Sequence, residues 1–271
     1  MTPRPAVPST DPSKVLVERY DREAAAYAEL WAPVLRTASR RLLPRMAGSR
    51  VDRVLDLGTG VGTLLPDLTV AFPRARIIGV DRSRGMLSLA PPAFPRLAMD
   101  ANHLAIRDDC MDRVLVLFML FHLDEPARGL REARRVLRRG GQIGTITWGS
   151  ELECPASRVW TECLDAHGAD PSDPAVISRH DRTDTEEKVA TMVVAAGFGD
   201  LDCWTEELVH RFDVDSLLRL RTSLGSMKPR FESLAPDARE ACVSEARRRM
   251  SALPPEGLLA RARLVHSVAH A

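Results

Sequence analysis

Three glycines at alternate positions, Gly58, Gly60 and Gly62, are residues whose type and spacing indicate chemistry. They follow the short apolar stretch 51–57 and precede a predicted helix over 63–72. Glycine lets the backbone pass close to a ligand where a Cβ would collide, and the start of a helix offers unpaired N–H groups. The segment therefore predicts a ligand cradle between a buried strand and a helix.

The spacing of these glycines distinguishes between two kinds of cofactor. A dinucleotide-binding fold favours Gly-x-Gly-x-x-Gly, and counting from Gly58 puts Thr63 at the third glycine. The chain instead reads Asp56-x-Gly-x-Gly-x-Gly. This pattern resembles motif I of the class I S-adenosylmethionine-dependent methyltransferases. The resemblance implies that Asp56, Thr59 and the three glycines bind that cofactor.

An acidic residue stands at the end of the next predicted strand, 75–80. Asp81 lies 21 residues beyond Gly60, and its two carboxylate oxygens can accept from both hydroxyls of a ribose. The stretch 79–87 resembles the second motif of the same family. This implies that Asp81 and Arg82 bind the cofactor and that Met86 packs on its adenine. The alternative for Asp81 is to cap the following helix, and the two roles are compatible.

Two further blocks extend the resemblance. The stretch 99–104 is similar to Gly-Asp-Ala-x-x-Leu, with Met99 at the glycine position. The stretch 130–144 is similar to Leu-x-Glu-x-x-Arg-Val-Leu-Lys-Pro-Gly-Gly, with Arg139 in place of the proline. The first of these blocks implies three more cofactor-binding residues: Asp100, Ala101 and Asn102.

The loop after the predicted central strand 113–120 is expected near the chemistry, because ligands of open parallel sheets bind beyond the carboxyl ends of the strands. We predict that Leu117 contacts the cofactor and that His122 is a general base or an acceptor ligand. Related methyltransferases often read Leu-His-His-Leu here, whereas this chain has one histidine between Phe121 and Leu123. A structural or capping histidine is the alternative.

The N-terminal segment 13–46 has helical spacing, with Pro33 as a kink or a break. Residues 20–27 fit the form Tyr-Asp-Arg-x-Ala-x-x-Tyr, which closes over the cofactor in similar methyltransferases. The resemblance implies a helical lid in which Tyr20 and Tyr27 contact the cofactor, and core packing is the alternative. Residues 1–12, rich in Pro, Ser and Thr, are predicted to form a disordered tail.

Residues 149–183 interrupt the alternation of strands and helices inside the predicted methyltransferase domain, 47–271. An insert at this point would overhang the site and shape an acceptor pocket. Packing or surface exposure is the alternative for each of its polar and aromatic side chains. Five residues are candidates for binding the acceptor: Trp31, Phe118, Trp160, Arg179 and His180.

The alternation of apolar strands and helices from residue 51 onward predicts an α/β fold with a parallel sheet covered on both faces. The chain resembles the small-molecule, ubiquinone/menaquinone-type methyltransferases, which include many secondary-metabolism tailoring enzymes. The resemblance covers about 51–148. It implies a Rossmann-like, seven-stranded, mostly parallel sheet with an antiparallel last strand, an N-terminal helical lid and an insert after strand five.

Composition narrows the classes of partner. The chain has 271 residues, 45% of them hydrophobic, and a net charge of +1, which gives no reason to expect a nucleic acid. Five scattered cysteines without Cys-x-x-Cys favour reduced thiols in the cytoplasm and no metal site. The longest apolar run, 114–121, is too short to span a membrane. The sequence is also compatible with a homodimer.

The cofactor implied by the motifs determines the expected reaction. Its methyl group sits on a sulfonium, so the enzyme mainly aligns an acceptor in line with the methyl–sulfur bond and excludes water. We expect transfer to an O, N or C atom of a small organic acceptor, and the apolar strand end suits an aromatic or polyketide-like natural product. The alternatives are a non-catalytic S-adenosylmethionine-binding protein and a nicotinamide-dependent oxidoreductase.

Overall fold

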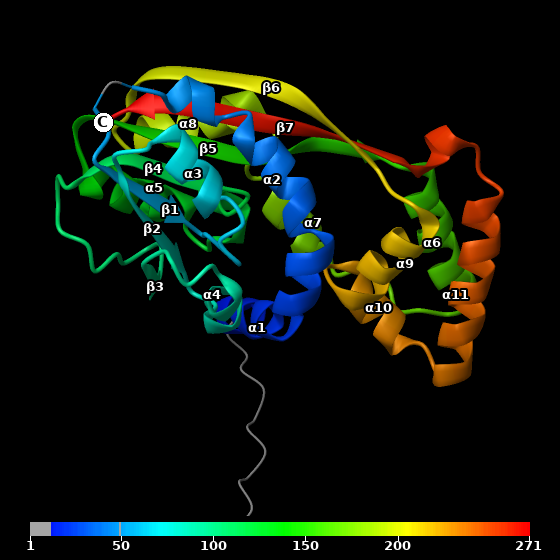
Figure 1. Cartoon of the computed structure of the whole chain (residues 1–271). Coiled ribbons are helices and arrows are strands. Elements are labelled where there is room, and N and C mark those ends of the chain that lie inside the picture. Colours follow the sequence, from blue (N-terminus) through cyan, green and yellow to red (C-terminus); the bar gives the residue numbers. More distant parts are fainter. Residues whose placement is uncertain (1–11, 49) are drawn as a thin grey trace, which may run out of the picture.

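The computed structural model describes residues 12–48 and 50–271. Within these residues a seven-stranded sheet has the order β3-β2-β1-β4-β5-β7-β6 (Figure 1). Strand β7 is antiparallel to both of its neighbours, and the other pairs are parallel, which confirms the predicted fold. The strands are β1 Arg53–Leu57, β2 Arg76–Asp81, β3 Arg96–Ala98, β4 Met111–Leu117, β5 Leu137–Glu153, β6 Gly199–Arg211 and β7 Leu259–His270.

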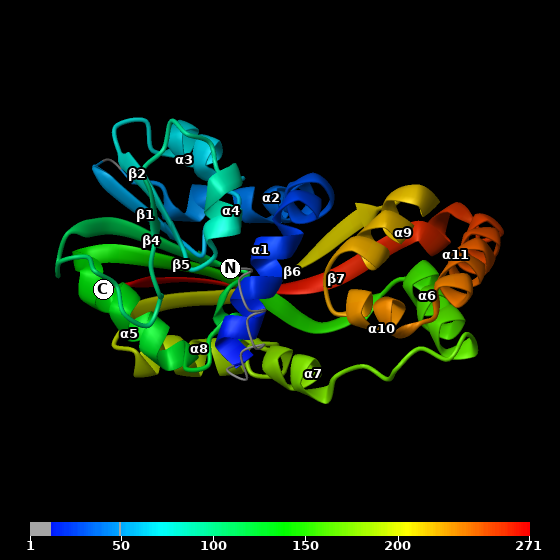
Figure 2. The ribbon, with the colours of Figure 1, turned by 90° about the horizontal axis from the view of Figure 1, so that it is seen from below.

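Helices cover both faces of this sheet. One face carries α2 and α3, and the opposite face carries α5 and α8 (Figure 2). The α-helices are α1 Pro12–Leu30, α2 Ala32–Arg40, α3 Leu65–Ala71, α4 Arg84–Leu89, α5 Pro126–Val136, α6 Pro155–Ala166, α7 Pro174–His180, α8 Glu186–Ala195, α9 Val214–Ser223, α10 Met227–Ser233 and α11 Pro236–Ser251. The short 3-10 turns are η1 Leu43–Met46, η2 Leu120–His122 and η3 Pro255–Leu258.

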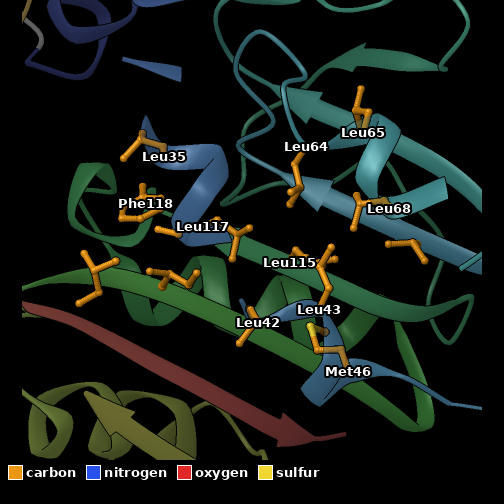
Figure 3. Close-up of a cluster of buried hydrophobic side chains, with 14 of the residues drawn as sticks. Leu35, Leu42, Leu43, Met46, Leu64, Leu65, Leu68, Leu115, Leu117 and Phe118 are labelled. Atoms are coloured by element: carbon orange, nitrogen blue, oxygen red, sulfur yellow. The ribbon is translucent and has the colours of Figure 1, made fainter. Parts of the chain in front are cut away.

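The two cores follow from the alternation of side chains along buried strands. In β4, Leu115 points to the face of α2 and α3, whereas Val114 and Val116 point to the face of α5 and α8. All seven residues of β4 are buried, as expected for a central parallel strand. Figure 3 shows the first core, where Leu42 and Met46 at the end of the N-terminal segment pack near Leu115.

A separate group of helices extends from the far end of the sheet. The sequence predicts that the fifth strand ends at Trp148, but β5 continues to Glu153 and leads directly into α6. Helix α6 packs with α9 and α11 around its own buried cluster (Figure 2). We call α6, α9, α10 and α11 the helical cap. The part of the predicted insert that forms α6 therefore belongs to this cap and does not overhang the strand ends.

The N-terminal segment forms two helices that break at Trp31, and Pro33 lies in the first turn of the second helix. A break was one of the alternatives considered for Pro33. Helix α1 lies between the sheet and the helical cap, where it contacts α4 on one side and α9 on the other (Figure 2). The predicted tail, 1–12, lies outside the described residues except for its last residue, Pro12, which begins α1 and so belongs to the helix.

Candidate functional site

A cavity lies beyond the carboxyl ends of β2, β1 and β4, under helix α1. It encloses about 760 Å³, part of it open to solvent, and we call it the main cavity. The place agrees with the general position of ligands in open parallel sheets. It brings together eleven of the predicted residues: Tyr20, Tyr27, Gly58, Gly60, Asp81, Arg82, Met86, Ala101, Leu117, Phe118 and His122.

The glycine loop runs close to the cavity because its backbone adopts conformations that other residues avoid. Gly58 and Gly60 have φ of 82° and 56°, and a Cβ at Gly58 would lie 2.6 Å from the Cγ of Met119. The third glycine has a different function. A Cβ at Gly62 would lie 2.9 Å from Ala90 and Leu65, and Gly62 does not line the cavity, so it serves the packing of the loop.

Asp81 presents a half-buried carboxylate at the end of β2. One of its oxygens accepts from the Gly60 N–H at 2.8 Å and the other from the Ser83 N–H at 2.9 Å. Burial raises its pKa, and these backbone donors oppose the rise. Ser83 is the N-cap of α4, since its Oγ accepts from the Met86 N–H at 3.0 Å. Each Asp81 oxygen keeps accepting capacity for a ligand hydroxyl.

Asp56 and Thr59 line a neighbouring cavity of about 430 Å³, which we call the side cavity. It shares Tyr27, Gly58 and Leu117 with the main cavity. The Thr59 hydroxyl donates to Asp56 at 2.7 Å. Burial raises the pKa of Asp56 to about 6, the Thr59 hydrogen bond lowers it, and the charge of Asp81 raises it further.

Helix α1 is fixed over the main cavity by a carboxylate that the sequence analysis did not single out. Asp21 accepts from the Ser83 hydroxyl at 2.6 Å and from the Gly85 N–H at 2.7 Å. A Cβ at Gly85 would lie 2.7 Å from the Asp21 Cα, so a glycine is needed for this approach. The contact positions Tyr20 and Tyr27, whose rings meet edge to face at 6.1 Å.

His122 meets a tyrosine of the lid. Its Nε2 lies 2.8 Å from the Tyr20 hydroxyl. Burial lowers the pKa of His122 to about 3, and the charges of Arg19, His180 and Arg179 lower it further. The imidazole is therefore neutral near pH 7, and its Nε2 accepts from the hydroxyl. A weakly basic nitrogen that already has a donor is a poor general base, so this geometry favours a positioning role over the predicted base.

Several predicted residues lie beside the main cavity without lining it. Asp100 accepts from the Asn102 N–H at 2.9 Å and lies 3.9 Å from the Arg82 Nε. The buried Asn102 Oδ1, which has no hydrogen-bond partner within the part of the chain described, lies toward α5, next to Gly129. The flanking Ala101 lines the cavity instead. The motif thus lines the cavity through its alanine, and the cofactor contacts of Asp100 and Asn102 stay predictions.

The aromatic and basic candidates from the insert occupy different places. Trp160 is fully buried in the helical cap, 5.7 Å from the ring of Phe231, so it packs the cap and was wrongly predicted to bind an acceptor. Trp31 stacks on Trp148 at 5.9 Å and does not line the cavity. His180 stacks at 4.4 Å on Phe121, next to His122. It lies behind the cavity wall.

Other residues of the wall carry no signal in the sequence. Leu16 and Val17 line the main cavity from α1, and Met119 and Leu123 line it from the loop after β4. Their apolar types are equally common in cores, so only their placement in three dimensions identifies them. Asp21, in contrast, lies inside the lid pattern and could have been examined as its attachment point.

The residues present fit S-adenosylmethionine. The glycine loop leaves room for a ligand, Asp81 offers two oxygens for a ribose, and Met86 and Leu117 offer apolar contacts for a base. The acidic Asp56 faces the adjoining side cavity, where an ammonium group would be favoured. Among the described residues, no group of three His, Cys, Asp or Glu side chains is placed to hold a metal ion.

Comparison with known proteins points to one family. A family model described as a methyltransferase domain matches residues 55–144. The chain is 29% identical to a malonyl-[acyl-carrier protein] O-methyltransferase of Geobacter sulfurreducens, over 76% of this chain and 79% of that protein. It is 36% identical to a demethylmenaquinone methyltransferase of Clavibacter sepedonicus, over 42% of this chain and 46% of that protein.

A solved structure shares the fold over nearly the whole chain. It is the phosphoethanolamine N-methyltransferase 2 of Haemonchus contortus, in complex with phosphomonomethylethanolamine and S-adenosylhomocysteine. The TM-score is 0.58 and the identity 18%, with 99% of this chain and 61% of that chain covered. Within the described residues, no helix is long and apolar enough to cross a bilayer.

Proposed function

The chain belongs to the class I S-adenosylmethionine-dependent methyltransferases, and we propose that it transfers the methyl group of S-adenosylmethionine to a small organic acceptor in the main cavity. One observation carries this proposal: a single cavity joins the glycine loop and Asp81 to a wall of apolar side chains. A ligand with a polar sugar at one end and a reaction partner at the other fits such a cavity.

The residues of the chain bind and orient, and the cofactor supplies a methyl group already activated by its positive sulfur. We assign the ribose to Asp81, the adenine to Met86 and the charged amino-acid end to the side cavity beside Asp56. Tyr27 stands between the two cavities and helps α1 to exclude water. Direct in-line displacement then requires alignment of the acceptor more than proton transfer.

The acceptor is argued from the cavity wall, because the relatives named above are methyltransferases for different acceptors: an acyl-carrier-bound malonyl group, a quinone precursor and a phosphoethanolamine. Leu16, Val17 and Phe118 line the main cavity together with His122. This apolar wall supports an acceptor with an aromatic or polyketide-like body. A tailoring role in secondary metabolism follows from such an acceptor.

A reducing cytoplasm is the compartment we propose for the protein. All five cysteines are free, and Cys110, Cys163 and Cys242 are buried. Three buried thiols without disulfides suit a chain that stays where thiols remain reduced. The side chains that line the main cavity are mixed apolar and polar, which supports a small molecule over a nucleic acid as the acceptor.

Methyl-labelled S-adenosylmethionine tests the proposal. The protein is incubated with the labelled cofactor and an extract of the native host, and the label is then followed in the small-molecule, protein and nucleic-acid fractions. We expect the label in organic small molecules, and loss of transfer in Asp81→Ala. Label confined to macromolecules would contradict a small-molecule acceptor. No transfer by wild type that binds the cofactor would favour a non-catalytic binding protein over this proposal.

A further inference from the structure

The main cavity and the side cavity meet at a small group of shared residues. Among the residues described, four line both cavities: Tyr27, Gly58, Leu117 and Phe118. We call this group the junction. None of its side chains is charged at neutral pH, since burial raises the pKa of the Tyr27 phenol further above that range. The junction is therefore uncharged, and two of its four residues present aromatic rings.

Carboxylates lie on both sides of the junction. Asp81 lines the main cavity and Asp56 lines the side cavity, and the charges of both raise the pKa of Tyr27, which lines both. The proposed function places the ribose at Asp81 and the charged amino-acid end beside Asp56. The sulfur of S-adenosylmethionine joins these two parts of the molecule, so this assignment puts the sulfur at the junction.

Each cavity wall also has one arginine within the described part of the chain, and each arginine faces a carboxylate of its own. In the side cavity, the Nε and Nη2 of Arg36 donate to Asp67 at 2.6 and 3.0 Å. In the main cavity, the Arg82 Nε lies 3.9 Å from an Asp100 oxygen. These pairings offset the charges of the two arginines, so a cation at the junction is repelled less strongly.

Phe118 is held at the junction in a strained backbone conformation. Its φ is 55°, in the left-handed region that few residues with a side chain adopt. Its N–H donates to the Ile146 carbonyl at 2.7 Å, and its ring lies 5.0 Å from that of Trp148, which stacks on Trp31. Figure 3 shows Phe118 beside Leu117, the preceding junction residue. Conformations of this kind persist only where surrounding contacts hold them, and they cluster at ligand sites.

We propose that the rings of Phe118 and Tyr27 hold the positively charged sulfur of the cofactor at the junction, and that Phe118 thereby favours S-adenosylmethionine over the spent product. This inference rests on the proposed function and names the residues that give its cofactor site a charge preference. The negative face of an aromatic ring attracts a cation, more strongly where water is excluded. S-adenosylhomocysteine, which remains after the methyl group has gone, has a neutral sulfur and gains no such attraction.

The preference acts on the exchange of the cofactor more than on the rate of transfer. The positive charge on sulfur decreases as the methyl–sulfur bond breaks and its electrons return to sulfur. The rings therefore stabilise the bound reactant at least as well as the transition state, and such an interaction does not raise the rate of the chemical step. The attraction is absent once the product has formed, which favours replacement of the product by a new cofactor molecule.

Binding of the charged and the neutral form of the cofactor tests this inference without knowledge of the acceptor. Calorimetric titration gives the ratio of the dissociation constant of S-adenosylhomocysteine to that of S-adenosylmethionine, for wild type and for Phe118→Leu. We expect this ratio to fall at least about threefold in the variant, as the loss of one cation–aromatic contact would give. Sinefungin, an analogue with an ammonium group in place of the methyl group, should lose affinity as S-adenosylmethionine does.

Matched variants separate the charge preference from packing. Phe118→Tyr keeps the ring and should keep the ratio. Phe72→Leu removes a ring of the same core that lines neither cavity, and it should also keep the ratio. If Phe118→Leu does not fold, Tyr27→Leu takes its place under the same criterion. A folded variant that weakens both ligands equally, or neither, would overturn the inference and leave the proposed function intact, whereas folded wild type that binds neither ligand would contradict both.

Discussion

The two ends of the main cavity have opposite electrostatic character. At one end Asp81, with Asp56 in the adjoining side cavity, has a raised pKa because burial disfavours the carboxylate. At the other end His122 has a lowered pKa because burial and nearby cations disfavour the imidazolium. Burial thus acts on both ends but in opposite directions on the pKa. The acidic end suits a cationic, hydroxyl-rich cofactor, whereas the other end presents a neutral imidazole.

Removal of the Asp81 carboxylate should give the largest effect on the acidic end. Asp81→Ala should weaken S-adenosylmethionine binding by about 1–3 kcal/mol, roughly 5- to 150-fold, because charge-assisted hydrogen bonds to the ribose are lost. Calorimetric titration of the cofactor measures this change. Asp52→Ala, at an exposed position just before β1, is the matched control and should bind like wild type. Unchanged affinity in Asp81→Ala would remove the ribose assignment.

Asp56 should separate stability from binding at the same end. Its pKa of about 6 in the folded protein exceeds the ordinary value of 3.8, so its contribution to stability falls as pH rises from about 4 to 6. Asp56→Asn should therefore stabilise the cofactor-free protein at pH 7 by about 1–2 kcal/mol while weakening cofactor binding. Urea unfolding at pH 7 and pH 4.5 measures this, and the gain should shrink at the lower pH. A destabilised variant at pH 7 would contradict the prediction.

His122 should show the reverse pH dependence at the other end of the main cavity. Its folded pKa is about 3, below the ordinary 6.5, so the folded state resists protonation and loses stability as pH falls below about 6.5. Between pH 7 and 5.5 wild type should lose about 1 kcal/mol more stability than His122→Gln, which does not titrate. Denaturant unfolding at the two pH values compares them. Parallel losses in both proteins would show that His122 does not resist protonation.

The smallest predicted effect concerns the attachment of the lid that spans both ends. Gly85→Ala should weaken cofactor binding by less than about tenfold, because the new Cβ meets the Asp21 backbone and α1 must shift by a few tenths of an ångström or more. Hydrogen exchange should become faster over 13–30. Gly199→Ala is the matched control, since a Cβ there meets nothing within 4 Å. Equal exchange rates over 13–30 in the two variants would argue against this attachment of α1 through Asp21.

The acidic end could be predicted from the sequence because it depends on local features. Gly58 and Gly60 have positive φ, and Asp81 ends its strand, so each leaves a pattern that one segment of chain contains. The family resemblance added Tyr20 and Tyr27 to that list, and both line the cavity. Their roles toward the cofactor stay predictions until binding is measured.

The surroundings of His122 could not be predicted because they are assembled from distant segments. Arg19 lies among many arginines of the chain, and only the placement of α1 brings it beside His122, about a hundred residues later. The prediction that Trp160 binds the acceptor was wrong for a related reason. Pairing with β7 carries β5 beyond Trp148 to Glu153, and this extension places α6 in the helical cap and away from the strand ends.

Titration of the purified wild-type protein with S-adenosylmethionine and, separately, with S-adenosylhomocysteine tests the central claim most directly. The account predicts micromolar binding of both ligands, since the adenosine contacts proposed for Asp81 and Met86 would be common to them. Failure of the folded protein to bind either ligand would contradict the account, because the cavity beyond β1, β2 and β4 would then serve a different ligand.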